Sequence, residues 1–185
     1  ISKMIRGFAK IHSLIIAGTP TPVILLILYY VVFGRIRNMS GIVVSIICFI
    51  LTFGAFVYEH TILSVNSVDQ GQREAAYALG YTRNKTFFRI ILPQAMMFFM
   101  PSYSSQVVEL IKATSVVGYI AVSDLTTIGD LIRSNTYEAF FPLIAIAAIY
   151  FLLTWLASVI LSFISMRFEP KRRSKKEILK GVKTV

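Results

Sequence analysis

The chain has 185 residues, of which 56% are hydrophobic and 15% charged, and its mean hydropathy is +0.70. A soluble domain has about a quarter of its residues charged, so this composition indicates an integral membrane protein. Cys48 is the only cysteine, which excludes a disulfide within the chain and a metal cluster built on cysteine.

The first ten residues carry three positive charges, at Lys3, Arg6 and Lys10. Charges at this spacing interrupt any apolar run, so the segment is not a secretory signal peptide. Because the chain begins with Ile1 rather than Met, we expect it to be the C-terminal portion of a longer protein.

Residues 14–33 form the first predicted membrane span, since about 20 mostly apolar residues suffice to cross ~30 Å of hydrocarbon. Gly18, Pro20 and Pro22 interrupt its first half. They free backbone groups that lipid cannot satisfy, so we expect this end to pack against protein or to lie at the interface.

Residues 40–58 form the second predicted span, with no charged residue until Glu59. Glu59 and His60 are expected to close it. A histidine beside a glutamate can serve as a proton relay or a ligand pair. At the end of a span, an interfacial and structural role is the favoured interpretation.

A basic polar insert follows at residues 72–94. Asp69 and Gly71 are expected to start a short helix over about 72–79, and Gly80 fits the left-handed position that ends many helices. Thr82 is predicted to cap a second helix that runs to about Ile91, because Pro93 disfavours helical geometry in the residue before it. The insert is therefore expected to be two short helices with an elbow at Gly80.

Residues 95–122 form the third predicted span and contain both Glu109 and Lys112. Ionisable residues at membrane depth are costly and indicate a bundle interior or a water-filled path. The two residues are three apart and can also simply neutralise each other on one helix face. Lining of a path is favoured over self-pairing alone.

Residues 139–166 form the fourth predicted span, which has no charged residue. Residues 169–185 are predicted to be a basic tail that acts as a topological anchor rather than a nucleic-acid site. Residues 1–10, the insert and the tail are all net positive, whereas the connection at 123–138 is acidic, so the positive-inside rule places the first three in the cytoplasm. Arg35 and Arg37 oppose this topology, because it puts their loop outside.

Three motifs carry a resemblance to a known family. Glu74-Ala75-Ala76 followed by Gly80 and by Leu92-Pro93 resembles the EAA loop of ATP-binding cassette importer permeases. Gly18-Thr19-Pro20 with a later tyrosine pair, and Lys112-x-Thr114-Ser115, are similar to elements of the polar amino-acid uptake branch. The resemblance covers residues 18 to about 168. Members of that branch usually have five spans, so the first span is expected to be missing here.

The resemblance implies an all-α polytopic membrane bundle of the bacterial cytoplasmic membrane, with four spans visible in a permease domain at residues 1–168 and a cytoplasmic C-terminus. The chain has no phosphate-loop motif of its own. ATP hydrolysis is therefore expected in a separate ATPase subunit, and no catalytic residue, cofactor or metal is expected here. Other implied partners are membrane lipid, a second permease subunit, identical or similar, and an extracytoplasmic substrate-binding protein or fused binding domain.

The implied site residues fall into two groups. The coupling group, expected to contact the ATPase, comprises Glu74, Ala75, Ala76, Leu79 and Gly80. The path group, expected to line the route of a polar amino acid, comprises Glu109, Lys112, Thr114 and Ser115. An ion-coupled carrier or channel that uses Glu59, His60, Glu109 and Lys112 as a charge relay is the alternative function, and a membrane scaffold is a third. Which amino acid is carried does not follow from the sequence.

Overall fold

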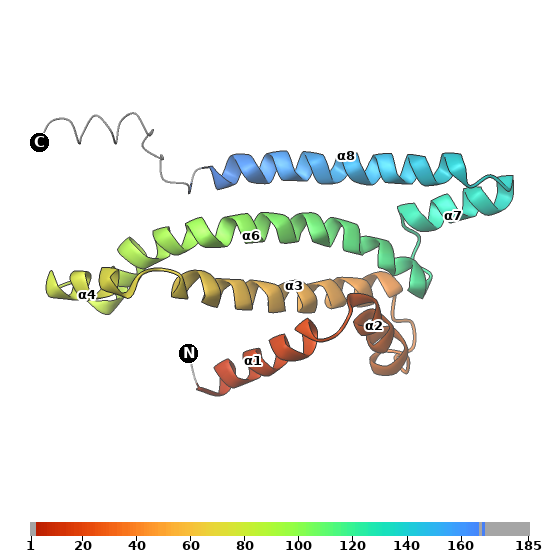
Figure 1. Cartoon of the computed structure of the whole chain (residues 1–185). Helices are drawn as coiled ribbons and strands as arrows, with labels where there is room; N and C mark the ends of the chain where they lie inside the picture. Colours follow the sequence, from red (N-terminus) through yellow and green to blue (C-terminus); the bar gives the residue numbers. More distant parts are fainter. Residues whose placement is uncertain (1–2, 167, 169–185) are drawn as a thin grey trace, which may run out of the picture.

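The computed structural model describes residues 3–166 and residue 168, and every regular element within them is a helix. Four segments run back and forth along one axis in the order α1, α3, α6, α8 (Lys3–Ala17, Gly41–Asn66, Leu92–Ala113 and Phe140–Ser165). They lie as neighbours in that order (Figure 1). The predicted all-α bundle is confirmed, and the predicted basic tail at 169–185 lies outside the described residues.

Two helices, α3 and α8, are each long and apolar enough to cross a membrane alone. Each has 26 residues, which at 1.5 Å per residue is about 39 Å, longer than ~30 Å of hydrocarbon. Counting each of two bent helix pairs as one further span gives up to four spans within the described residues. α8 begins and ends within one residue of the predicted fourth span.

The first predicted span is wrong as a single helix. α1 already begins at Lys3, and the chain then turns by 110° into α2 (Thr21–Leu26) and the π-helical segment η1 (Ile27–Val32). The break lies at Gly18, Thr19 and Pro20, because proline has no N–H to continue the ladder of α1. Pro22 is tolerated, since it occupies the first turn of α2, where N–H groups have no partner within the helix.

The second predicted span begins correctly but ends too early. Ser40 caps α3, its hydroxyl accepting from the N–H of Ile42 at 3.3 Å. Glu59 and His60 do not close the helix, which continues to Asn66. Two charged or polar side chains do not interrupt a helical backbone when they find partners: Glu59 accepts from Ser13 of α1, and His60 stacks on Phe56 with ring centroids 3.9 Å apart.

The predicted stop before Pro93 is also wrong. The chain stays helical from α5 (Arg83–Thr86) through the π-helical segment η2 (Phe87–Ile91) into α6. Leu92, just before the proline, has φ −59° and ψ −46°. A π turn widens the helix locally, and a proline-kinked helix is the recognised exception to the rule for the residue before proline. The third span is otherwise as predicted, with α6 continuing into the 3-10 segment η3 (Thr114–Ile120).

The acidic connection after the third span contains a helix of its own, α7 (Leu125–Thr136), which packs against α8. Gly129 is buried at this contact, and a Cβ there would lie 1.9 Å from Cδ1 of Ile146. The connection thus lies close against α8 only because residue 129 has no side chain. α2 and α7 occupy the opposite end of the bundle from α4 (Gln70–Ala78) (Figure 1).

Two clusters of buried apolar side chains lie in the described part of the bundle. One joins α2, α3 and η3 through Ile24, Leu25, Cys48 and Ile120. The other joins the end of α3 to the start of α6 through Val68, Ile91 and Ala95. The second cluster forms the base on which the polar insert rests.

Candidate functional site

The polar insert projects from one end of the bundle as α4, an elbow, and α5 (Figure 1). Asp69 begins α4, its carboxylate accepting from the N–H of Gly71 at 2.6 Å. A carboxylate here satisfies a helix N–H that has no partner within the helix and interacts favourably with the helix dipole. The predicted start of the helix is confirmed to within two residues.

α4 ends in a Schellman motif built around Gly80. The N–H of Tyr81 donates to the carbonyl of Ala76 at 3.0 Å, and the N–H of Gly80 donates to Tyr77 at 2.9 Å. Gly80 has φ +76°. These two bonds satisfy carbonyl groups at the end of α4 that have no partner within the helix. The motif needs a residue in the left-handed conformation, which glycine adopts most easily. The predicted elbow at Gly80 is confirmed.

Two hydrogen bonds tie α4 back to the bundle. Arg73 donates from Nη2 to the carbonyl of Val65, near the end of α3, at 3.2 Å. Gln94, in the first turn of α6, donates from Nε2 to Oε1 of Gln72 at 3.5 Å and to the carbonyl of Ile90 at 3.1 Å. α4 is therefore linked to α3 at one side and to α6 at the other.

The residues of the predicted coupling group divide between two faces of α4. Ala76 is 1% exposed and packs against its own chain. Glu74, Ala75, Leu79 and Gly80 are all exposed, Leu79 by 78%. The Glu74 carboxylate has no hydrogen bond or ion pair with the rest of the described chain. α4 thus presents a free carboxylate and an apolar side chain to solvent, while a small residue lets it lie close to the bundle.

The second arm of the elbow is a basic helix start. Thr82 has the extended backbone of an N-cap, as predicted, but its side chain makes no capping bond. The ammonium of Lys85 lies 4.5 Å from the centre of the Tyr81 ring, a favourable cation–π distance. Thr86 is buried and its hydroxyl donates to the Thr82 carbonyl at 3.1 Å.

The predicted path group lies at the other end of α6. Nζ of Lys112 is 2.5 Å from a carboxylate oxygen of Glu109, and both side chains are about half exposed in this single chain. The hydroxyls of Thr114 and Ser115 donate to the carbonyls of Ile111 and Lys112 at 2.7 and 2.9 Å. Glu109 and Lys112 therefore form the ion pair that their i, i+3 spacing allows. That these four residues line a translocation path stays a prediction.

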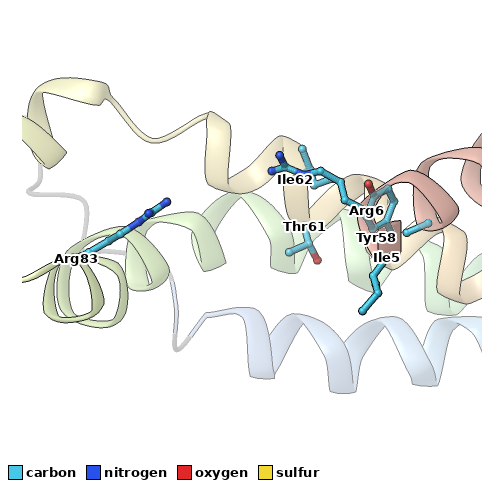
Figure 2. Close-up of a pocket in the computed structure, with 7 residues that line it drawn as sticks. Ile5, Arg6, Tyr58, Thr61, Ile62 and Arg83 are labelled. Carbon is cyan, nitrogen blue, oxygen red and sulfur yellow. The ribbon is translucent and has the colours of Figure 1, made fainter. Parts of the chain in front are cut away.

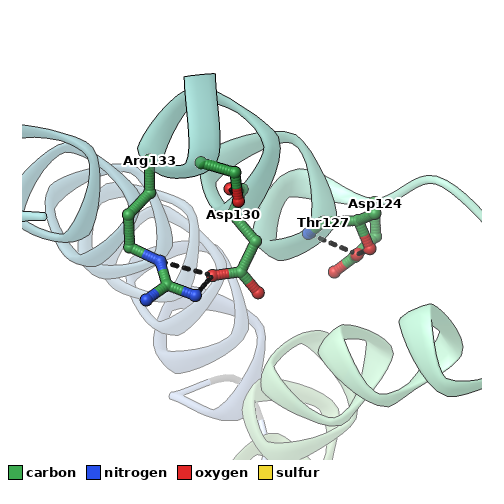
Figure 3. A network of polar contacts seen from close by, with 5 residues as sticks. Asp124, Thr127, Asp130 and Arg133 are labelled. Atoms are coloured by element: carbon green, nitrogen blue, oxygen red, sulfur yellow. Dashed lines mark hydrogen bonds and ion pairs between the residues drawn. The ribbon is translucent and has the colours of Figure 1, made fainter. Parts of the chain in front are cut away.

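Ser115 also lines a cavity of about 420 Å³ between η3 and α7. Thr126, Thr127 and Asp130 line its other side. Figure 3 shows the polar contacts beside it: Asp130 pairs with Arg133 at 3.2 Å, and Asp124 accepts from the N–H of Thr127 at 2.9 Å. Burial alone would raise the pKa of Asp124, but the hydrogen bonds from Thr127 and Thr126 outweigh it and hold that pKa below its usual value.

The four residues of the alternative charge relay are not brought together. Glu59 and His60 lie toward the α4 end of α3, whereas Glu109 and Lys112 lie toward the α7 end of α6. Each already has a local partner. The described residues also contain no group of three or more histidine, cysteine, aspartate or glutamate residues that could hold a metal ion.

Several contacts of the site were not predicted from the sequence. The linkage of Arg73 to Val65, and that of Gln72 to Gln94, join residues 8 and 22 positions apart. No periodicity specifies such pairs. The only sequence signal was that Gln72 and Gln94 stand at the two ends of the insert.

The chain matches the family model described as "Binding-protein-dependent transport system inner membrane component" over residues 1–174. It is 33% identical to the putative glutamine transport system permease protein GlnP of Rickettsia typhi, covering 89% of this chain and 76% of the relative. It is 32% identical to the L-cystine transport system permease protein TcyB of Bacillus subtilis, with 89% and 71% covered. A solved structure titled "Crystal structure of an amino acid ABC transporter with histidines" superposes with a TM-score of 0.81 at 33% identity, covering 89% of this chain and 77% of that one.

Proposed function

The chain belongs to the family of binding-protein-dependent transport system inner membrane components, in its amino-acid ABC permease branch, and from this premise we propose that it moves a polar amino acid inward across the cytoplasmic membrane. The energy comes from a separate ATPase subunit that docks on α4. The relatives are glutamine and cystine permeases by name, which supports an amino acid as the substrate.

The observation that carries the proposal is the build of α4. Its outer face is exposed and offers an unpaired carboxylate at Glu74 and an apolar anchor at Leu79, while its base is tied to α3 by Arg73 and to α6 by Gln72. Leu79 lies in the polar insert rather than in a predicted span, so its exposed side chain is available to a docked subunit rather than to lipid. A short helix with a free tip and a fixed base can pass a displacement of a docked subunit to both spans.

The mechanism that fits this build is a rocking motion. The ATPase offers a groove for Leu79 and a cationic group for Glu74, and its closure on ATP displaces α4. The hydrogen bonds from Arg73 to Val65 and from Gln94 to Gln72 carry that displacement into the ends of α3 and α6. Two permease subunits, identical or similar, would move together between inward-open and outward-open states.

The path group is proposed to act at the far end of α6. The Glu109–Lys112 pair has one charge of each sign, as does a zwitterionic amino acid, and the hydroxyls of Thr114 and Ser115 lie within one turn. The end of the bundle that holds α2 and α7 is proposed to face outward, where a substrate-binding protein or a fused binding domain delivers the amino acid. The start of α1, α4 and the end of α8 are proposed to face the cytoplasm.

Co-purification of the full-length protein with candidate ATPase subunits tests the proposal. We expect one ATPase to be retained by the natural protein and lost with Glu74→Arg. Glu138→Arg makes the same charge change at the opposite end of the bundle and should leave binding intact. Retention of the ATPase by Glu74→Arg, or its loss from both variants, would remove α4 as the docking element.

A further inference from the structure

A cavity of about 720 Å³ opens between α1, α3 and α5, and no residue of the coupling group or of the path group lines it. Its lining combines two guanidinium groups, Arg6 and Arg83, with the hydroxyl-bearing Tyr58 and Thr61 and the apolar Ile5, Ala9 and Ile62. Figure 2 shows Arg6 entering this space from α1 and Arg83 from the insert, with Thr61 of α3 between them.

The charge in this cavity is uncompensated by the described part of the chain. No acidic residue lines it, and neither Arg6 nor Arg83 forms an ion pair or hydrogen bond with any described residue. Two like charges that face one space repel each other and favour an anion between them. Guanidinium groups bind phosphate through two parallel hydrogen bonds, and hydroxyls can complete its coordination.

The depth of the cavity matches the level of lipid headgroups. Tyr58 lies 17 residues beyond the start of α3 at Gly41, about 26 Å along the axis at 1.5 Å per residue, and Thr61 lies about 30 Å along. Hydrocarbon is ~30 Å thick, so these residues stand where it ends. Tyrosine is enriched at that level.

An apolar surface continues from the cavity along α1. Ile5 lines the cavity, and Phe8 and Ile15, which follow it along the same side of the helix, are 75% and 60% exposed. Acyl chains attached to a headgroup in the cavity can lie along that surface, which a free phosphate cannot use. The volume falls in the range of ligand pockets, roughly 300–1,000 Å³.

We propose that this cavity binds the phosphate of an anionic phospholipid headgroup, with Arg6 and Arg83 on the phosphate oxygens and the acyl chains along α1. The lipid then bridges α1, a membrane helix, and α5, the second arm of the elbow. This inference does not depend on the amino-acid transport proposed above.

The test is a lipid titration of the purified full-length protein, with bound lipids counted by native mass spectrometry. Phosphatidylglycerol is the anionic probe and phosphatidylcholine the neutral comparison. The charge variant is Arg6→Gln with Arg83→Gln. The matched control, Arg35→Gln with Arg37→Gln, removes two arginines from the opposite end of the bundle. Thr61→Trp fills the cavity without removing charge.

We expect the charge variant to bind phosphatidylglycerol at least about tenfold more weakly, because two basic residues are removed. Thr61→Trp should also bind it more weakly because the indole fills the cavity, while the control variant binds it normally and phosphatidylcholine binding does not change. Soluble glycerol 3-phosphate should not displace the lipid. An unchanged affinity in Thr61→Trp or in a folded charge variant, or an equal loss in the control, would overturn the proposal. Displacement by glycerol 3-phosphate would also overturn it, since the site would then hold a soluble phosphate ester.

Discussion

Ser13 of α1 donates a hydrogen bond to the carboxylate of Glu59 in α3. Ser13 is 2% exposed whereas Glu59 is exposed, so this bond joins two neighbouring membrane helices at the edge of their contact. It also explains why α3 does not end at Glu59: the carboxylate has a protein partner and does not require the interface.

Ser13→Ala is expected to destabilise the protein by about 0.5–1.5 kcal/mol, because it removes a hydrogen bond that joins α1 to α3 while the exposed Glu59 carboxylate stays solvated. Thermal unfolding of the purified protein in one detergent measures the effect. Ser162→Ala is the matched control, since Ser162 is exposed and bonds only to the carbonyl of Val159 in its own helix. Equal melting temperatures for both variants would show that the Ser13–Glu59 bond contributes nothing.

At Gly80 the space around the residue is open, and only its φ of +76° restricts substitution. Gly80→Asn should therefore keep ATP-driven uptake near the natural level, because asparagine tolerates the left-handed conformation. Gly80→Val should reduce uptake at least several-fold while membrane insertion is retained, since a β-branched residue is strained there. Uptake into vesicles with the ATPase present separates the two. Normal uptake by Gly80→Val would mean that the elbow geometry is not needed for coupling.

Gly129→Ala is expected to separate α7 from α8 or to displace Ile146, because the added Cβ would meet Cδ1 of Ile146 at 1.9 Å. Overpacking of this kind typically costs about 1–3 kcal/mol. Adding Ile146→Val, which removes Cδ1, should restore part of the lost melting temperature. If the double variant is no more stable than Gly129→Ala, a clash between residue 129 and Ile146 is not the cause of the lost stability.

The hydrogen bonds to Asp124 make the stability of the folded protein depend on pH, and they determine the sign of that dependence. Its pKa in the folded protein is below the ordinary value of 3.8. The stabilisation that the ionised Asp124 carboxylate contributes is therefore fully present above about pH 3.8. It is lost as the pH falls through the lowered pKa of the folded state. Asp124→Asn should lower the melting temperature at neutral pH, and the difference from the natural protein should shrink in acid. A difference that stays constant down to low pH would contradict this origin.

The elements that sequence predicted well are those set by local rules. Asp69 begins α4 as a cap, the second span begins at Ser40, Gly80 takes the left-handed position, and the uncharged run of α8 gives its bounds to within one residue. The EAA spacing located the candidate site through family resemblance. These features depend on residue type and short spacing alone.

The errors arose where tertiary partners override local preference. Glu59 is inside a helix because Ser13 lies opposite it, and helical geometry passes through Pro93 because a π turn precedes it. The 110° turn after Ala17 was visible as a cluster of glycine and prolines, but the sequence did not say that α1 would start at Lys3 and carry the apolar face. The cavity between Arg6 and Arg83 joins residues far apart in the chain, which no sequence pattern encodes.

Exchange of the two charges of the path group distinguishes a structural ion pair from a substrate contact. Glu109→Lys with Lys112→Glu keeps one charge of each sign at the same i, i+3 spacing and exposure. If the two residues only neutralise each other, uptake should survive the exchange. The two orientations of an exposed ion pair differ in their contribution to stability by only about 0.5 kcal/mol.

We expect uptake to fall at least tenfold in the exchanged protein, with insertion and ATPase binding retained, since a zwitterionic amino acid would then meet each charge in the wrong place. Competition by unlabelled amino acids in the same vesicles shows whether the residual uptake has changed preference. The single variants Glu109→Gln and Lys112→Gln complete a double-mutant cycle. Full uptake by the exchanged protein would leave Glu109 and Lys112 as a self-contained pair and move the proposed path to another face of the bundle.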